Sequence, residues 1–356
     1  MAYVSGSSHM GVERIHRRRN SGPQASGSLC CYLGNAVCIA ATMIAVLASG
    51  CSLFAQTEFD EVHITPRTKN VSVKGSNSDS SVLRSNVNLV QVSVSVLDHD
   101  DHAVEGLQVS NFIVFDDKVP QSIRYFSQED APLSVVVVLD TSGSMAPKMD
   151  SARHAAIEFL NGCNVNDEIS VITVASTPRL KNIFSDSMEE IRETINVAQA
   201  DGTTSLWDSV YLGIQELRSA RLPRKAMVII SDGGDNASRF TEASLRRLLQ
   251  ESSVQVYGIG FFESFPRTQE EKGGSRWLDD ITNVTGGRLF TAHDDADASR
   301  AATQVSRELR NEYILSYYAN YPERNGKWRN IKVKLTAAPS DKFHLYAKKG
   351  YYSPID

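Results

Sequence analysis

The chain has 356 residues, of which 37 are Lys or Arg and 42 are Asp or Glu, so its formal net charge is −5. That balance argues against a protein built mainly to bind nucleic acid, which would concentrate positive charge on one face. With 41% hydrophobic and 22% charged residues, the composition is that of an ordinary soluble globular protein. The length allows two or three domains with real cores.

Cysteine usage separates the start of the chain from the rest. Of the five cysteines, only Cys163 lies beyond residue 51; the others are Cys30, Cys31, Cys38 and Cys51. The body of the protein therefore has no intrachain disulfide framework and no cysteine metal cage. Cys163 follows a helical pattern, and we expect a packed or unreactive thiol there.

Residues 1–55 have the pattern of an export signal. The basic residues Arg14 and Arg17 to Arg19 precede an apolar run over 32–47, and the small residues Ala48, Ser49 and Gly50 follow. These are the three parts of a secretory signal. The apolar core is too short and too interrupted for a clear membrane span, so an N-terminal anchor helix is the weaker alternative. We expect an exported protein of the periplasm, outer envelope or medium.

Two cleavage sites fit this signal. The segment Leu47-Ala48-Ser49-Gly50-Cys51 resembles a bacterial lipobox, although its Leu lies one place further upstream than usual, and Cys51 would then carry a lipid. A cut after Ala55 would instead leave Gln56 as the first residue and discard Cys51. Either cut removes the arginine cluster, so the mature chain is more acidic than the total charge suggests.

A polar linker separates the signal from the first predicted strands. Residues 56–84 are rich in Ser, Asn and Lys, and such a stretch cannot bury enough apolar surface to offset its ordering entropy. Residues 87–97 then alternate apolar and polar side chains, which predicts a half-buried strand. With shorter strand-like pieces at 112–115 and 122–126, this predicts a small β-domain over 85–129.

The turn after the first strand carries acidic and imidazole groups. It reads Asp98-His99-Asp100-Asp101-His102, and these side chains could bind a metal. Because the segment connects two predicted strands, we interpret it as a solvated hairpin turn.

Residues 131–310 have the pattern of an α/β domain. The run Ser134 to Leu139 is almost continuously β-branched, as expected of a parallel strand buried on both faces. Further strands are predicted at 168–175, 226–231, 254–261 and 288–291. Helical patterns fall at 148–160, 189–199, 206–219, 241–251, 276–283 and 296–310. This alternation predicts a doubly wound, mainly parallel sheet flanked by helices.

After Arg310 the pattern returns to strands, predicted at 313–318, 330–335 and 343–352. These form a C-terminal β extension over 311–356. They would either pack with the N-terminal β-region or extend the edge of the sheet. The predicted fold class is thus α/β with small β-rich flanking regions.

Three groups of oxygen-bearing residues follow strands or open helices of the predicted sheet. They are Asp140-Thr141-Ser142-Gly143-Ser144, Gly202-Thr203-Thr204-Ser205 and Ser231-Asp232-Gly233-Gly234-Asp235. In open parallel sheets, ligands bind where the strands end at their carboxyl edge. None of the groups contains His or Cys, so the site suits Mg²⁺, Mn²⁺ or Ca²⁺ rather than zinc or copper. Two carboxylates balance a divalent charge, and three neutral hydroxyls leave the ion electrophilic toward an outside carboxylate.

The pattern Asp140-x-Ser142-x-Ser144, then Thr204, then Asp232 resembles the metal-ion-dependent adhesion site of the von Willebrand factor type A domain. The resemblance covers roughly 131–310. It implies that Ser142, Ser144 and Thr204 coordinate the ion directly and that Asp140 and Asp232 act largely through bound water.

Several neighbours of this motif have alternative interpretations. Thr203 competes with Thr204, although the spacing to Leu206-Trp207-Asp208 favours Thr204. Asp235 is expected to be a helix-capping or loop residue, and the alternative is that it supports the metal site without being a direct ligand. Trp207 and Tyr211, one helical turn apart, are expected to pack in the core.

The flanks of the motif resemble a bacterial subgroup of exported proteins related to this domain. That subgroup combines a short β-region before the metal motif with an end like Lys349-Gly350-Tyr351-Tyr352. Its biological role is poorly defined, so the resemblance informs the chemistry of the site more than its purpose.

The same residues could serve a binding module or a hydrolase. A phosphatase-like hydrolase could use Asp140 as nucleophile, but that family has a second acid two residues later, where this chain has Ser142. Neither His154 nor His293 follows a nucleophile-elbow motif. We therefore expect no enzyme but an extracytoplasmic protein-binding or adhesion module. It would bind a divalent cation, with Mg²⁺ favoured and Mn²⁺ or Ca²⁺ as alternatives.

In this interpretation the protein partner supplies an Asp or Glu to the ion. No nucleic acid is involved, and membrane contact occurs only through an N-terminal lipid or an uncleaved signal. A structural envelope protein without metal dependence is the third alternative.

Overall fold

A computed structural model describes residues 88–128, 130–185, 187–263, 269–319, 325–336 and 342–355. The predicted signal, Cys51 and the whole predicted linker lie outside these described residues and stay predictions. Within the described part of the chain, no helix is both long and apolar enough to span a bilayer.

The central sheet has six strands in the order β10-β9-β8-β5-β6-β7. All neighbouring strands are parallel except β6 and β7. The middle strand β5 is buried at all its positions, as its β-branched sequence predicts. The strands are β5 (Leu133–Asp140), β6 (Glu168–Val174), β7 (Arg179–Ser185), β8 (Arg224–Ser231), β9 (Gln255–Gly260) and β10 (Leu289–Thr291).

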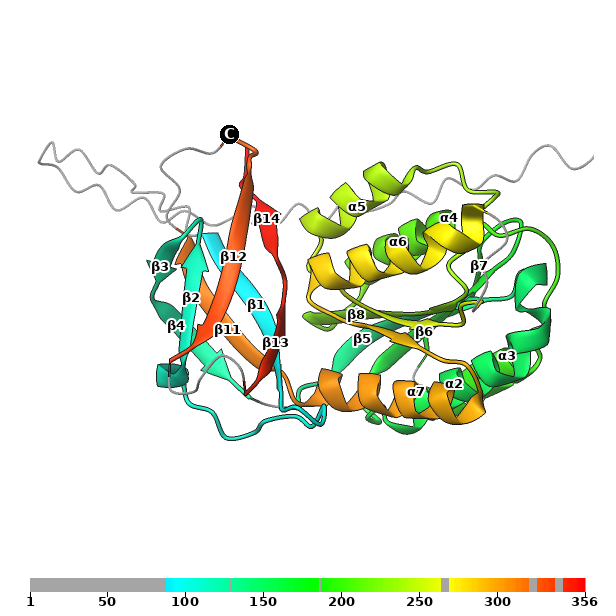
Figure 1. The fold of residues 1–356 in the computed structure, drawn as a ribbon, viewed down its shortest axis with the longest axis horizontal. Coiled ribbons are helices and arrows are strands. Elements are labelled where there is room, and N and C mark those ends of the chain that lie inside the picture. Colours follow the sequence, from blue (N-terminus) through cyan, green and yellow to red (C-terminus); the bar gives the residue numbers. More distant parts are fainter. Residues whose placement is uncertain are drawn as a thin grey trace, which may run out of the picture. The chain divides into compact units, whose positions relative to one another are not determined.

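Helices cover both faces of this sheet (Figure 1). Val135 and Val137 of β5 pack in one core with α2, α3 and α7, whereas Val136 and Val138 pack in a second core with α4, α5 and α6. The helices are α2 (Met149–Asn161), α3 (Met188–Asn196), α4 (Leu206–Ser219), α5 (Glu242–Glu251), α6 (Gln269–Thr285) and α7 (Asp295–Arg310). The predicted doubly wound α/β architecture is confirmed.

Within the central sheet domain, the sequence pattern misses one strand and shortens one helix. Strand β7 alternates exposed and partly buried positions and includes Arg179 and Lys181, so it has the polarity of a loop. It pairs antiparallel with β6 at the edge of the sheet. Helix α6 begins at Gln269 rather than at the predicted Arg276, because Gly273 and Gly274 weaken the helical pattern without ending the helix.

The strands on either side of the α/β domain form a two-sheet sandwich. The sheet orders are β13-β1-β11-β4 and β14-β12-β2-β3, and all pairs are antiparallel. N-terminal strands thus pair with C-terminal ones. The strands are β1 (Asn88–Leu97), β2 (Phe112–Asp116), β3 (Val119–Gln121), β4 (Ile123–Ser127), β11 (Tyr313–Ala319), β12 (Trp328–Leu335), β13 (His344–Ala347) and β14 (Gly350–Tyr352).

Both sheets of the sandwich contribute to one core, which includes Val92, Phe112, Val114, Tyr313 and Ile331. The segment predicted as a single strand over 343–352 is two strands. β13 belongs to one sheet and β14 to the other, so the chain changes sheets at Lys348 and Lys349.

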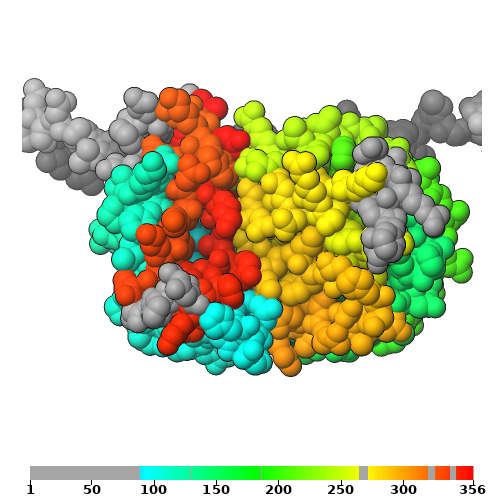
Figure 2. Space-filling view, viewed as in Figure 1, coloured from blue at the N-terminus to red at the C-terminus, as the bar shows by residue number. Residues whose placement is uncertain are grey.

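Polar contacts join the sandwich to the α/β domain. The Lys348 ammonium donates to the Ser252 carbonyl at 2.6 Å, and the Tyr352 hydroxyl donates to the Gln250 side chain at 3.3 Å. Figure 2 shows the C-terminal strands, in orange and red, beside the yellow and yellow-green helices of the sheet domain.

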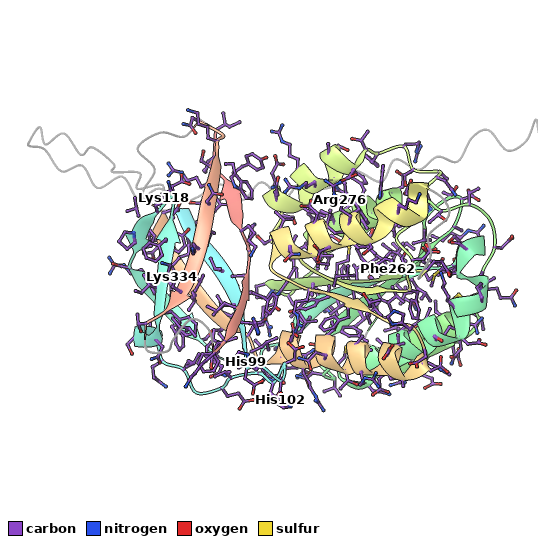
Figure 3. The ribbon with its side chains drawn as sticks, in the orientation of Figure 1. His99, His102, Lys118, Phe262, Arg276 and Lys334 are labelled. Carbon is purple, nitrogen blue, oxygen red and sulfur yellow. The ribbon has the colours of Figure 1, made fainter. Side chains whose placement is uncertain are left out.

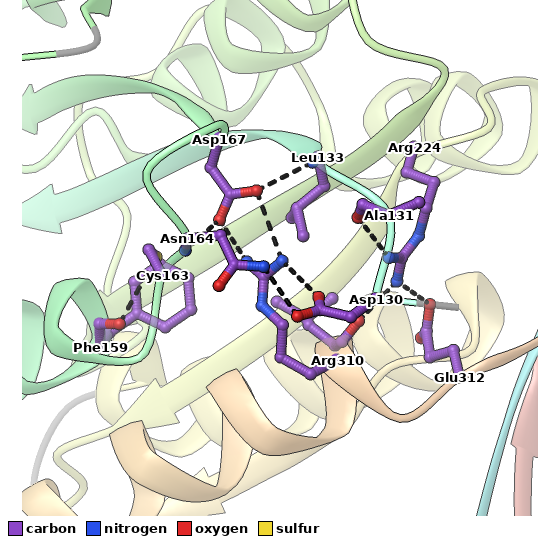
Figure 4. Close-up of polar contacts among 11 residues, drawn as sticks. Asp130, Ala131, Leu133, Phe159, Cys163, Asn164, Asp167, Arg224, Arg310 and Glu312 are labelled. Atoms are coloured by element: carbon purple, nitrogen blue, oxygen red, sulfur yellow. Dashed lines mark hydrogen bonds and ion pairs between the residues drawn. The ribbon is translucent and has the colours of Figure 1, made fainter. Parts of the chain in front are cut away.

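Buried ion pairs gather at the amino ends of the central strands (Figure 4). Arg310, the last residue of α7, pairs with Asp167, and Arg224, the first residue of β8, pairs with Glu312 at 3.1 Å. These contacts fix the exit from α7 into β11. Nearby, the Cys163 thiol donates to the Phe159 carbonyl at 3.5 Å, and burial raises its pKa to about 12. This environment fits the unreactive thiol that the sequence predicts.

The close approach of Gly233 and Gly274 predicts a large difference between two neighbouring substitutions. A Cβ at position 274 would lie 2.7 Å from the Gly233 backbone, whereas a Cβ at position 273 has nothing within 4 Å. We expect Gly274→Ala to lower the free energy of unfolding by about 1–3 kcal/mol and Gly273→Ala to raise it by up to about 1 kcal/mol. Urea denaturation of both variants checks this; equal effects would contradict the packing.

Candidate metal centre

The first of the three predicted groups lies where β5 ends. Asp140 is fully buried. One of its carboxylate oxygens accepts the Ser142 backbone N–H at 3.0 Å, and the other accepts the Ser231 hydroxyl at 2.5 Å. Ser231 ends the neighbouring strand β8. The carboxylate is thus oriented by neutral donors from two adjacent strand ends.

The charge of Asp140 is poorly compensated. Burial, and to a smaller extent the negative charge of Asp232, raises the pKa of Asp140 from 3.8 to about 6, although the hydrogen bonds from Ser231 and Ser142 oppose this rise. One carboxylate oxygen of Asp232 accepts the Gly234 backbone N–H at 3.1 Å. Two carboxylates therefore lie near each other in a largely buried place, and a bound cation would stabilise both in their charged forms.

The two serines of the motif converge as the sequence predicts. The hydroxyl oxygens of Ser142 and Ser144 are 3.2 Å apart. Ser142 is buried and Ser144 is exposed, so the pair lies between the buried carboxylate and the surface. The loop is held by the second group, since the Gly143 N–H donates to the Gly202 carbonyl at 3.0 Å and the Asp201 N–H donates to the Thr141 carbonyl at 2.8 Å.

The second group distinguishes Thr204 from Thr203. The Thr203 hydroxyl donates to the Ser176 hydroxyl at 3.0 Å, which turns it toward the β6–β7 connection. The Thr204 backbone N–H donates to the Asn236 side chain at 2.9 Å, and the Thr204 carbonyl accepts the N–H groups of Asn236 and Ala237. The Thr204 hydroxyl has no hydrogen-bond partner among the described residues. Thr204 is therefore the threonine free to offer its hydroxyl to an ion.

Asp235 does not share this arrangement. Its carboxylate accepts the Trp207 N–H at 2.9 Å and the Ser238 hydroxyl at 2.6 Å. These contacts cap the first turn of α4, which is the helix-capping role that the sequence favours for it.

Three residues support the site in roles that were not assigned to them from the sequence, although Ser231 belongs to the third predicted group. Ser231 holds Asp140, Asn236 holds Thr204, and the Lys148 ammonium lies 3.9 Å from Asp232 and 2.8 Å from Glu263. Ser231 precedes Asp232 directly at the end of an apolar run, which is a usable signal. Asn236 and Lys148 carry no such signal, because their roles depend on how the loops pack.

The donor set fits a hard divalent cation. Ser142, Ser144, Thr204, Asp140 and Asp232 offer only hydroxyl and carboxylate oxygens, which Mg²⁺, Mn²⁺ and Ca²⁺ prefer. With both Asp140 oxygens accepting protein hydrogen bonds, the serine and threonine hydroxyls are the groups placed for direct contact.

A second acidic group lies in the sandwich. Ligand atoms of Asp98, Asp100 and His102 all lie within 4.8 Å of one another. However, the Asp98 carboxylate accepts the N–H groups of Asp100 and His102, both at 2.9 Å, and this arrangement stabilises a turn. Figure 3 shows His102 and the neighbouring His99 on this turn.

Comparison with known proteins agrees with the sheet topology. Residues 135–234 match the profile of the von Willebrand factor type A domain. The sheet domain has the von Willebrand factor type A fold. Among solved structures, the chain is similar to a von Willebrand factor type A protein from Catenulispora acidiphila. The two are 13% identical over 76% of this chain and 75% of that chain, with a TM-score of 0.44.

Two curated proteins that are similar to this chain are uncharacterized. One from Synechocystis is 22% identical over 51% of this chain and 42% of its own length. YwmC of Bacillus subtilis is 22% identical over 51% of this chain and 87% of its own length. The chain thus spans less than half of the first relative.

The raised pKa of Asp140 predicts a pH-dependent stability in the absence of metal. Because the folded state favours the protonated carboxyl, the stability that this group contributes is fully present below pH 3.8 and is lost as the pH rises through about 6. In chelator at pH 8, Asp140→Asn should therefore be more stable than the wild type by about 3 kcal/mol at most. The difference should shrink toward pH 4.

Chemical denaturation across this pH range, with and without Mg²⁺, measures the effect. Mg²⁺ should stabilise the wild type at pH 8 and leave Asp140→Asn unchanged. Stability curves that run parallel for the two proteins at all pH values would contradict the proposed burial of charge.

Proposed function

We propose that this chain is an extracytoplasmic protein-binding module whose von Willebrand factor type A domain holds a divalent cation, with Mg²⁺ favoured, and engages an acidic residue of a protein partner. The observation that carries the proposal is the convergence of the Ser142 and Ser144 hydroxyls at 3.2 Å beside the buried, uncompensated Asp140. In the proposed site Ser142, Ser144 and Thr204 hold the ion, which supplies an electrophilic position for a carboxylate.

The surface around the site is open to a macromolecular partner. Gly143, Ser144, Ala146, Gly202 and Thr203 are all exposed, whereas Asp140, Thr204 and Asp232 beneath them are buried. A carboxylate on a partner's surface can therefore approach the hydroxyls from outside without entering a deep cleft. This geometry suits protein recognition more than enclosure of a small substrate.

The geometry gives little support to a phosphatase-like hydrolase. Asp140 has no exposed surface, and both of its oxygens accept protein hydrogen bonds, so the carboxylate is badly placed as a nucleophile. Ser142 occupies the position where that chemistry needs a second acid. We accordingly propose that the chain is not an enzyme.

Two neighbouring threonines provide a matched test of the cation site. We expect Thr204→Val to weaken Mg²⁺ binding by at least about tenfold, because it removes an ion ligand. Thr203→Val should bind as the wild type does, because its hydroxyl is directed to Ser176. Isothermal titration calorimetry measures both, with circular dichroism as the control for folding. Equal Mg²⁺ affinity in the two variants would contradict the assignment of Thr204.

The choice between binding and hydrolysis has its own test. Partner capture from envelope extracts should require Mg²⁺ and fail in chelator or with Asp140→Ala. Phosphatase substrates should show no turnover in either condition. Robust turnover that disappears in Asp140→Asn would overturn the binding interpretation.

A further inference from the structure

A groove of about 540 Å³ lies beside the proposed cation site. Its lining comes from the β6–β7 hairpin, the end of α3 and the loop that leads to Thr204. Lining residues that matter here are Thr141, Ser176, Arg179, Lys181, Val197 and Gly202. The groove therefore lies next to the serine loop and along β7, the edge strand of the sheet.

Residues that line the groove also hold the loop of the proposed cation site. Thr141, Asp201 and Gly202 line the groove, and the same three residues fasten the serine loop through the Gly143 to Gly202 and Asp201 to Thr141 hydrogen bonds. Thr141 is adjacent to Ser142 in the chain. A partner segment that places a carboxylate at Ser142 and Ser144 can therefore continue directly into the groove.

The groove contains two basic side chains that have no partner among the described residues. Arg179 and Lys181 are exposed, and neither side chain makes an ion pair or hydrogen bond within the described ranges. Asp201 is the acidic residue that lines the groove, so the lining carries one excess positive charge. By contrast, Arg153, which donates to the Ala198 carbonyl just beyond α3, pairs with Asp150 at 2.6 Å. The free cations next to an electrophilic site favour an anionic partner.

Val197 gives the groove an apolar wall. Its side chain is 74% exposed although it follows α3 directly, and it lines the same groove as the two basic residues. Contact with a partner would cover this surface. Basic residues on an edge strand also discourage strand pairing between molecules. Peptide affinities of a variant that lacks both basic residues distinguish this role from partner recognition.

We propose that this groove binds a second acidic side chain of the partner, held by Arg179 and Lys181, so that the recognised segment carries two carboxylates at a fixed spacing. The first carboxylate meets the cation site and the second enters the groove. This inference rests on the proposed function and adds the chemistry of the partner: a diacidic segment, rather than any protein with one exposed acid.

Selection from a displayed random-peptide library tests the inference with the full chain. The selections are carried out in Mg²⁺ and in chelator with three proteins. These are the wild type, the groove variant Arg179→Gln/Lys181→Gln and the matched β12 control Lys332→Gln/Lys334→Gln. The control removes two exposed lysines of β12, far along the chain from the site. Peptides enriched in Mg²⁺ over chelator are then synthesised and their affinities measured.

We expect the wild type and the β12 control to enrich peptides with two acids at one spacing. The groove variant should bind these peptides about tenfold more weakly and should enrich peptides with a single acid. Mg²⁺ affinity measured by calorimetry should be the same in all three proteins, because none of the substitutions touches an ion ligand.

Each other outcome counts against a defined part of the proposal. Wild-type enrichment of single-acid peptides, or unchanged affinity of the groove variant for two-acid peptides, would overturn the diacidic inference and leave the cation site intact. Absence of any Mg²⁺-dependent enrichment by the wild type would contradict the proposed function itself, and the inference with it.

Discussion

The burial of a carboxylate at the end of β5 is the constraint on which the proposed site depends. Asp140 is held by one backbone N–H and one hydroxyl, and its negative neighbour Asp232 raises its pKa further. Neutral donors orient a buried charge but do not balance it. A cation bound by the adjacent hydroxyls would balance it, which links the stability of this loop cluster to occupancy of the site.

The fold supplies that constraint through its topology. Parallel strands β5 and β8 are neighbours, so the loops after Asp140 and Ser231 begin side by side although 91 positions separate these residues. Hydrogen bonds from Gly143 to Gly202 and from Asn236 to Thr204 then tie the three loops together. At the opposite end, Arg224 and Arg310 pair with buried acids and attach the sandwich. The edge of the sheet that carries the proposed cation site is thus left free of the flanking strands.

Much of this arrangement follows from local sequence patterns. The β-branched run before Asp140 predicts a central strand, and polar residues at the ends of strands predict the position of the site. The sequence does not predict the edge strand β7, because its exposed Arg179 and Lys181 give the segment the polarity of a loop. The division of 343–352 into β13 and β14 depends on which sheet each half joins, and the roles of Asn236 and Lys148 depend on loop packing. Such tertiary effects have no local signature.

An anomalous difference map from crystals grown with Mn²⁺ would test the central claim most directly. The account predicts a manganese peak bounded by the hydroxyl oxygens of Ser142, Ser144 and Thr204, with Asp140 and Asp232 just beyond it. A map with no peak at this position, or with its only peak at the Asp98–His102 turn, would contradict it.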